Sequence, residues 1–195
     1  MFHHAQRRVL LLTAVALAVG PTAGLGGHTA AQATSRHAGS THDQTADLRR
    51  ARAATRAFRD VDAARAAGYA ATGECAQDPK YGGMGIHYAN PDLVADGKLD
   101  VTKPEVLVYQ PTPSGTLRLG AIEYLRADAD QDLATDPDRP ELFGLPFDGP
   151  MLGHEPGMPV HYDLHVWLYR HNPAGLFAMW NPRVHCPNSD GHAGH

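Results

Sequence analysis

The stretch VHYDLHVWLYR, residues 160–170, leaves few choices for local structure. Apolar and polar side chains alternate along it, and a period of two predicts a β-strand because successive strand side chains point to opposite faces. One face is apolar and suits a core: Val160, Tyr162, Leu164, Val166 and Leu168. The other face mixes metal-ligating and aromatic side chains: His161, Asp163, His165, Trp167 and Tyr169. This strand therefore predicts a polar site beside a core.

A helix is predicted for residues 46–67, where apolar residues recur at helical spacing among alanines and arginines, both good helix formers. Residues 105–110 and 116–126 predict a hairpin around the turn PTPSG. A last hairpin is predicted to pair 160–170 with 176–180 through HNPAG.

Residues 71–104 are rich in glycine, proline and aspartate and are predicted to be mostly loop. One helix with these hairpins predicts an α+β fold, in which an N-terminal helix packs on a small antiparallel sheet with long Gly/Pro-rich loops. We expect a single domain over residues 46–187.

The N-terminus has the three-part pattern of a secretory signal peptide over residues 1–33. Two arginines precede an apolar run at residues 9–19, and Ala31-Gln32-Ala33 fits a cleavage site. That run is too short to span a bilayer, so we expect no integral membrane span after cleavage. Residues 34–45 are predicted to be a disordered leader, and residues 188–195 a flexible tail containing histidine. The sequence thus predicts an exported protein.

Charge and cysteine content narrow the class further. The formal net charge is −4 and no basic patch stands out, which argues against nucleic acid and anionic membranes as partners. Cys75 and Cys186 are the two cysteines of the chain. In an exported protein such a pair most often forms a disulfide, and two free thiols that ligate a metal are the alternative.

His87, Glu123 and His165 are the candidate metal ligands. Glu123 ends an apolar stripe, where a carboxylate is costly to bury unless it is paired or coordinated. His87 follows three glycines that let the backbone approach closely. A 2-His-1-carboxylate set suits iron, and with a water also zinc or manganese; copper is a further candidate. The alternatives are a solvated or arginine-paired Glu123 and a hydrogen-bonding surface His87.

Other residues of the polar strand face have auxiliary roles in this prediction. His161 and His165 lie about 13 Å apart along a strand, too far to bind one ion directly. His161 and Asp163 are therefore expected to be auxiliary ligands or to orient the ligands. Three aromatic side chains are predicted to wall a small-molecule pocket, with core packing as the alternative: Trp167, Tyr169 and Trp180.

The motifs MGIHY, KPEVLVYQP, IEY and YDLHVWLYRHNPAGLFAMWNPRVHC resemble those of an uncharacterised family of exported bacterial proteins. The resemblance covers about residues 46–187. It implies a recurring exported domain and brings no activity and no catalytic residues with it.

Three functions follow from these patterns. The first is an exported metal-binding protein that holds a divalent transition metal (zinc, copper, iron or manganese) at the His/Glu site. The second is a metal-dependent enzyme, of hydrolase or oxygenase type, that acts on a small molecule there. The third is a metal-free ligand-binding or structural module in which His165 and Glu123 hydrogen-bond each other.

Overall fold

The computed structural model describes residues 43–154 and 157–187. The predicted signal peptide, most of the predicted leader and the predicted tail lie outside these residues. No helix in the described part of the chain has the length and apolar character needed to cross a membrane.

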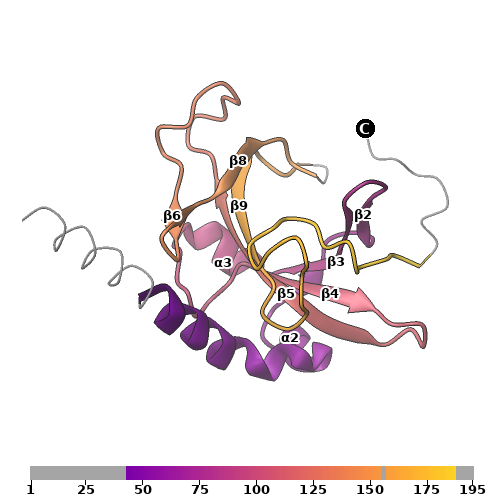
Figure 1. The fold of residues 1–195 in the computed structure, drawn as a ribbon. Helices are drawn as coiled ribbons and strands as arrows, with labels where there is room; N and C mark the ends of the chain where they lie inside the picture. Colours follow the sequence, from indigo (N-terminus) through magenta and orange to yellow (C-terminus); the bar gives the residue numbers. More distant parts are fainter. Residues whose placement is uncertain (1–42, 155–156, 188–195) are drawn as a thin grey trace, which may run out of the picture.

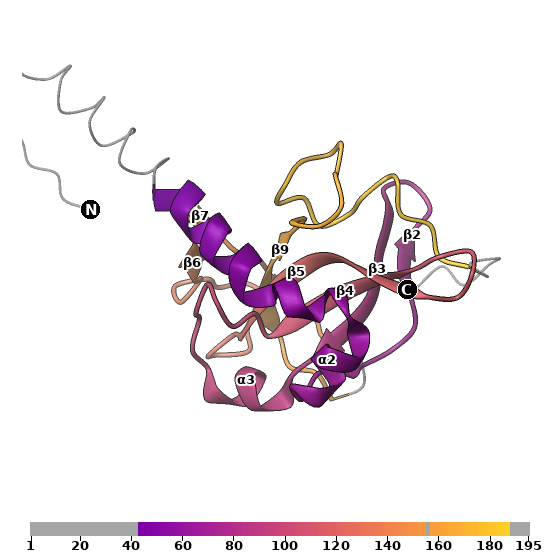
Figure 2. The ribbon, with the colours of Figure 1, turned by 90° about the horizontal axis from the view of Figure 1, so that it is seen from below.

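The N-terminal helix is predicted correctly in position but not in continuity. It runs from residue 43 to 55, tightens into the 3₁₀ helix η1 (Arg56–Arg59) and restarts as α2 (Val61–Ala66). The break falls at Asp60, whose backbone is extended. Its side chain caps α2 by accepting a hydrogen bond from the Asp62 amide at 3.0 Å. Figure 2 shows this helical segment crossing in front of the sheet.

The main sheet is antiparallel throughout, and its seven strands within the described residues follow the order β1-β3-β4-β5-β9-β8, with β2 paired to β3 (Figure 1). The bounds of the strands are β1 (Ala70–Ala71), β2 (Ala76–Asp78), β3 (Gly82–Ala89), β4 (Val106–Pro111), β5 (Leu117–Ala127), β8 (Asp148–Met151) and β9 (His161–Val166). A short helix, α3 (Pro91–Asp96), joins β3 to β4, and β6 (Glu141–Leu142) pairs with β7 (Leu145–Pro146). The α+β prediction is therefore confirmed.

Two local predictions are wrong. Residues 71–104 are not mostly loop, because they contain β2, the eight-residue β3 and α3. Three glycines hide β3 from the sequence pattern. Gly85 has φ +128°, and an added Cβ would lie 2.4 Å from the Tyr109 carbonyl oxygen, so glycine is needed where β3 approaches β4. Residues 176–180 form no strand, and β9 pairs with β5 and β8 instead.

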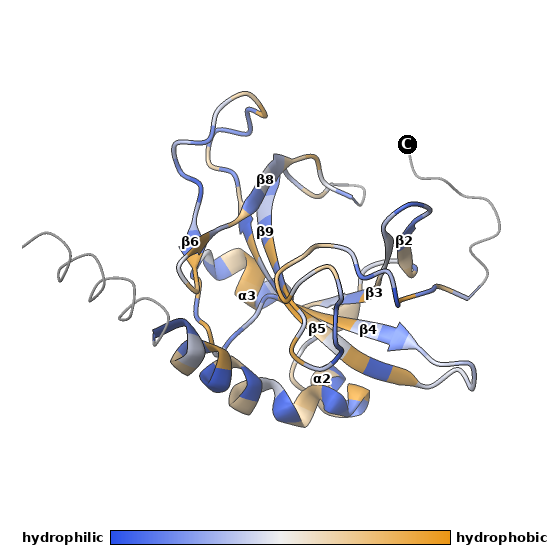
Figure 3. Cartoon of the chain, in the orientation of Figure 1, coloured by the Kyte–Doolittle hydropathy of each residue, from blue (hydrophilic) through white to orange (hydrophobic). Residues whose placement is uncertain are grey.

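The sheet is buried on both faces. The helical face carries the larger apolar cluster, which includes Leu107, Ile122, Tyr124 and Leu164 and receives the N-terminal helix. The opposite face carries a smaller cluster: Met84, Val106, Val108, Ala121, Leu125, Trp167 and Val184. Because both faces of the sheet are covered, the polar side chains of β9 point into the protein rather than into water. In Figure 3 the 128–138 loop is mostly blue, in keeping with its aspartates.

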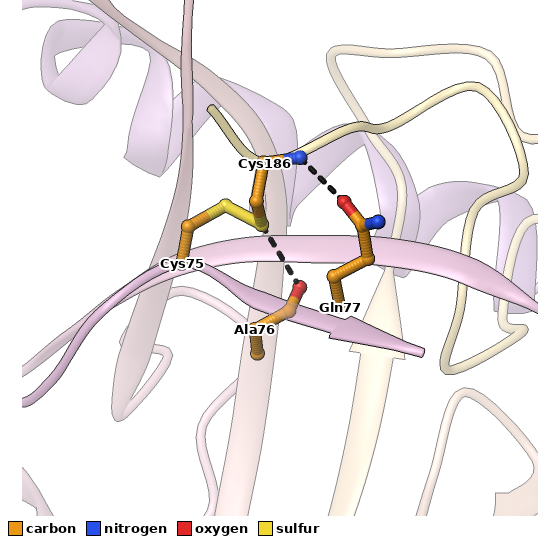
Figure 4. Close-up of a disulfide and its surroundings, with 4 residues drawn as sticks. All are labelled: Cys75, Ala76, Gln77 and Cys186. Atoms are coloured by element: carbon orange, nitrogen blue, oxygen red, sulfur yellow. Dashed lines mark hydrogen bonds between the residues drawn. A yellow bond between two sulfur atoms is a disulfide. The ribbon is translucent and has the colours of Figure 1, made fainter. Parts of the chain in front are cut away.

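The C-terminal segment, residues 167–187, covers part of this second face. The Asn181 and Gly83 backbones hydrogen-bond in both directions, at 3.0 and 3.2 Å, and Val184 packs into the same cluster. The segment is fixed by the Cys75–Cys186 disulfide, which confirms the predicted pairing. Figure 4 shows the Gln77 side chain beside the bridge, where its oxygen accepts the Cys186 amide at 2.6 Å.

We expect the disulfide to be a large contributor to stability. It closes a loop with a sequence separation of 111 residues. In the chain-entropy description, such a loop corresponds to about 4–5 kcal/mol. Replacing both cysteines by serine should lower the free energy of unfolding by about that amount in urea denaturation. Wild-type protein with its disulfide reduced is the matched control. A decrease in the free energy of unfolding below about 1 kcal/mol would contradict a large contribution of the disulfide.

Candidate metal centre

Strand register brings the three candidate ligands to one face of the sheet. Glu123 on β5 pairs directly with His165 on β9. His87 lies on β3, two strands from β5, and pairs with Val108 on β4, which in turn pairs with Ala121. The side chains between them are small, so the His87 ring reaches across β4 toward the Glu123 carboxylate.

Distances within this group suit a bound ion. One carboxylate oxygen, Glu123 Oε2, lies 3.4 Å from His87 Nε2 and 3.5 Å from His165 Nε2. The three ligand atoms all lie within 4.8 Å of one another. Zinc binds imidazole nitrogen and carboxylate oxygen at about 2.0–2.2 Å, and tetrahedral geometry then sets two ligand atoms about 3.4 Å apart. The observed spacing therefore matches donors arranged around a shared centre.

The same atoms do not hydrogen-bond one another. A charge-assisted N–H···O bond is about 2.7–2.9 Å long, well below the separations seen here. Glu123 Oε2 and both ring nitrogens of His165 are buried without a hydrogen-bond partner among the described residues. Their side chains are 5% and 1% exposed. Leaving a buried polar atom unpaired costs about 1–3 kcal/mol. A cation bound between these atoms would remove that cost, because each atom would then have a partner.

Asp163 stands behind His165. Its Oδ1 lies 3.7 Å from His165 Nδ1, on the side of the ring away from Glu123. A carboxylate in this position favours a proton on Nδ1 and leaves the Nε2 lone pair directed at Glu123 Oε2. That tautomer is the one able to ligate an ion shared with Glu123.

Burial and mutual charge shift the pKa values of the group strongly. Burial raises the pKa of Glu123 to about 7, against the opposing effect of His165. Burial also works to lower the pKa of His165, but the carboxylates of Glu123 and Asp163 outweigh it and raise that pKa to about 9. Burial and the charge of His165 lower the pKa of His87 to about 3. Without a metal, His165 is therefore the cation that balances the buried carboxylates at neutral pH.

The remaining residues of the predicted site divide between two locations. His161 and Asp163 lie on the same face of β9 as His165, both fully or almost fully buried. Trp167 belongs to the apolar cluster of this face, and Trp180 packs against it. Tyr169 is not brought to the group, since β9 ends at Val166. Its ring packs with the helical-face cluster and its hydroxyl lies 2.9 Å from the Thr55 hydroxyl.

Sequence reasoning missed His154. It lies in the connection between β8 and β9, and its ring stands edge-on to that of His161 with the centroids 5.2 Å apart. The connection is rich in glycine and proline, with no periodicity to show which way a side chain points. A histidine within a few residues of a polar strand face was the one available signal.

Comparison with protein-family models, with curated proteins and with solved structures returns no match for this chain.

The electrostatic description predicts the titration of His165. In protein kept free of metal by a chelator, its imidazole should titrate near pH 9 by NMR, because Glu123 and Asp163 stabilise the imidazolium. Glu123→Gln removes the largest of these attractions and should lower the midpoint by at least about one unit. Loss of the resonance in His165→Gln assigns it. Titration near pH 6.5 in both the wild type and Glu123→Gln would contradict the description.

Proposed function

We propose that this chain is an exported metal-binding protein in which His87, Glu123 and His165 hold one divalent transition-metal ion. The observation that carries the proposal is that Glu123 Oε2 lies 3.4 Å from His87 Nε2 and 3.5 Å from His165 Nε2, close to a tetrahedral-edge distance, with no hydrogen bond among the three atoms. A metal-free module held by a direct His165–Glu123 hydrogen bond fits this geometry less well, because 3.5 Å is too long for such a bond.

Charge balance supports a divalent ion. Glu123 and Asp163 place two carboxylates in a group that is almost entirely buried. A dication neutralises both, so the three histidines of this face can remain neutral, as metal ligation requires. In its absence the proton on His165 balances one carboxylate, and burial, which raises the pKa of Glu123 to about 7, leaves Glu123 partly protonated at neutral pH.

The donor set narrows the metal to a class. Two imidazoles and a carboxylate suit zinc, iron and copper, and also manganese once waters complete the shell. Hard cations such as calcium prefer six or more oxygen ligands, which this face does not offer among the described residues.

Export is part of the proposal. The disulfide fits an oxidising compartment. The N-terminal pattern of paired arginines, an apolar run and an A-x-A site supports secretion by a cleaved signal peptide. Membership in an exported bacterial family stays a prediction that rests on the motifs quoted above.

Metal content tests the proposal directly. We expect close to one ion of zinc, copper, iron or manganese per chain by elemental mass spectrometry of untagged protein purified without chelator. His165→Ala should reduce this content by at least tenfold, because it removes a buried ligand. His171→Ala is the matched control, since His171 is exposed and lies outside the candidate ligand group, and it should retain the wild-type content.

Two outcomes would reject the proposal. One is protein that binds none of the four metals after incubation with each. The other is metal content that is equal in His165→Ala and His171→Ala, which would place the bound ion elsewhere. Circular dichroism of each variant distinguishes loss of the site from loss of the fold.

A second function, metal-dependent catalysis on a small molecule, is favoured by one observation. Within the described residues the group has three protein ligands, which is the pattern of sites that keep a position for water or substrate. The His87 side chain is 21% exposed while the other two ligands are buried, so solvent approaches the centre from the His87 side.

An open position can be tested without knowing a substrate. Cobalt-substituted protein should show a visible absorption spectrum that changes on addition of azide, because the anion takes the free position. An unchanged spectrum at saturating azide would reject the enzymatic reading and leave the metal-binding function intact.

A further inference from the structure

We propose that His161, Asp163 and His154 form a second divalent-cation site beside the first, with Asp163 standing between the two. This inference goes beyond the proposed function, and its residues bind an ion whether or not the first site is filled. Among the described residues, His161 and Asp163 carry buried polar atoms of this face that lack hydrogen-bond partners, and the exposed His154 lies beside His161.

His161 supplies the most constrained donor. It is the first residue of β9 and its side chain is fully buried. Its Nδ1 lies 3.2 Å from the Pro159 carbonyl oxygen, which places the proton on Nδ1 because a carbonyl only accepts. Nε2 therefore carries a lone pair, and it is buried with no hydrogen-bond partner in the part of the chain that the structure describes. A neutral imidazole held in one tautomer by its other nitrogen is the usual form of a histidine metal ligand.

Asp163 supplies the negative charge. It lies two residues further along the same face of β9, which places the two side chains about 7 Å apart at the backbone. Both of its carboxylate oxygens are buried without a hydrogen-bond partner among residues 43–154 and 157–187. One of them faces His165. The other remains available to a cation on the His161 side.

His154 supplies an adjustable third donor. It is exposed, and its ring packs edge-on against His161 at 5.2 Å. It also lies close enough to Asp163 to interact with it electrostatically. This set is wider than the first site, where three ligand atoms already lie within 4.8 Å. The proposal requires the exposed His154 side chain to rotate toward Asp163, and exposed side chains change rotamer on the ps–ns timescale.

The chemistry of the set points to zinc or copper. Two imidazole nitrogens and one carboxylate oxygen form a donor set for which copper has the highest affinity in the divalent first-row series, and imidazole and carboxylate are also common zinc ligands. A buried water is the competing occupant, since it would donate to Asp163 and to His161 Nε2 without needing His154. The contribution of His154 therefore separates a metal site from a hydration site.

Zinc titration by calorimetry, with bound zinc counted by elemental analysis, tests the inference. Wild-type protein stripped of metal should bind two zinc ions per chain. His161→Ala and His154→Ala should each remove one ion or weaken the second binding step at least tenfold. His154→Ala is the decisive variant, because its side chain is exposed and its loss does not disturb the core. His171→Ala is the control and should bind as the wild type does.

The outcomes separate this inference from the proposed function. His165→Ala should lose the first ion and keep the second. If His165→Ala binds as wild type while His154→Ala loses one ion, the first site fails and the second stands. One ion in the wild type and in His154→Ala alike would overturn the second site and favour a water there. A variant with His185, His192 and His195 replaced measures zinc held by the C-terminal histidines, which is subtracted throughout.

Discussion

The pairing of Glu123 with His165 across β5 and β9 is the contact on which the site depends. It sets a carboxylate opposite an imidazole in the middle of a sheet that is buried on both faces. A slip of β9 by one residue against β5 would turn His165 into the helical-face cluster and Leu164 to the opposite face, and Glu123 would lose its partner. The apolar alternation of β9 therefore holds the polar row in place.

A buried polar row is costly to fold, and in the proposed function a bound cation offsets that cost. The C-terminal segment, fixed by the Cys75–Cys186 disulfide, packs apolar side chains on the same face as the ligands. This packing lowers the local dielectric, which strengthens attraction between the carboxylates and any cation. In the proposed function the stability of the fold and the affinity for an ion are linked, because both depend on the packing of the C-terminal segment over this face of the sheet.

The polar face of β9 could be predicted from the sequence, because the alternation of polar and apolar residues around His161, Asp163 and His165 is typical of a β-strand. Glu123 followed because a carboxylate in an apolar stripe needs a partner. The strand that carries His87, β3, could not be predicted from the sequence, because the glycines that permit its close approach to β4 are typical of loops. Tyr169 was misplaced because no local signal marks the end of β9 at Val166, where the chain leaves the sheet. The role of His154 depends on tertiary contact alone.

Anomalous X-ray diffraction, recorded at the absorption edge of the bound metal, tests the central claim most directly. The account predicts a peak about 2.0–2.2 Å from His87 Nε2, Glu123 Oε2 and His165 Nε2. The peak should vanish in crystals of His165→Ala grown under the same conditions. Crystals grown with saturating zinc that show no peak there, and that show Glu123 hydrogen-bonded directly to His165, would contradict the account.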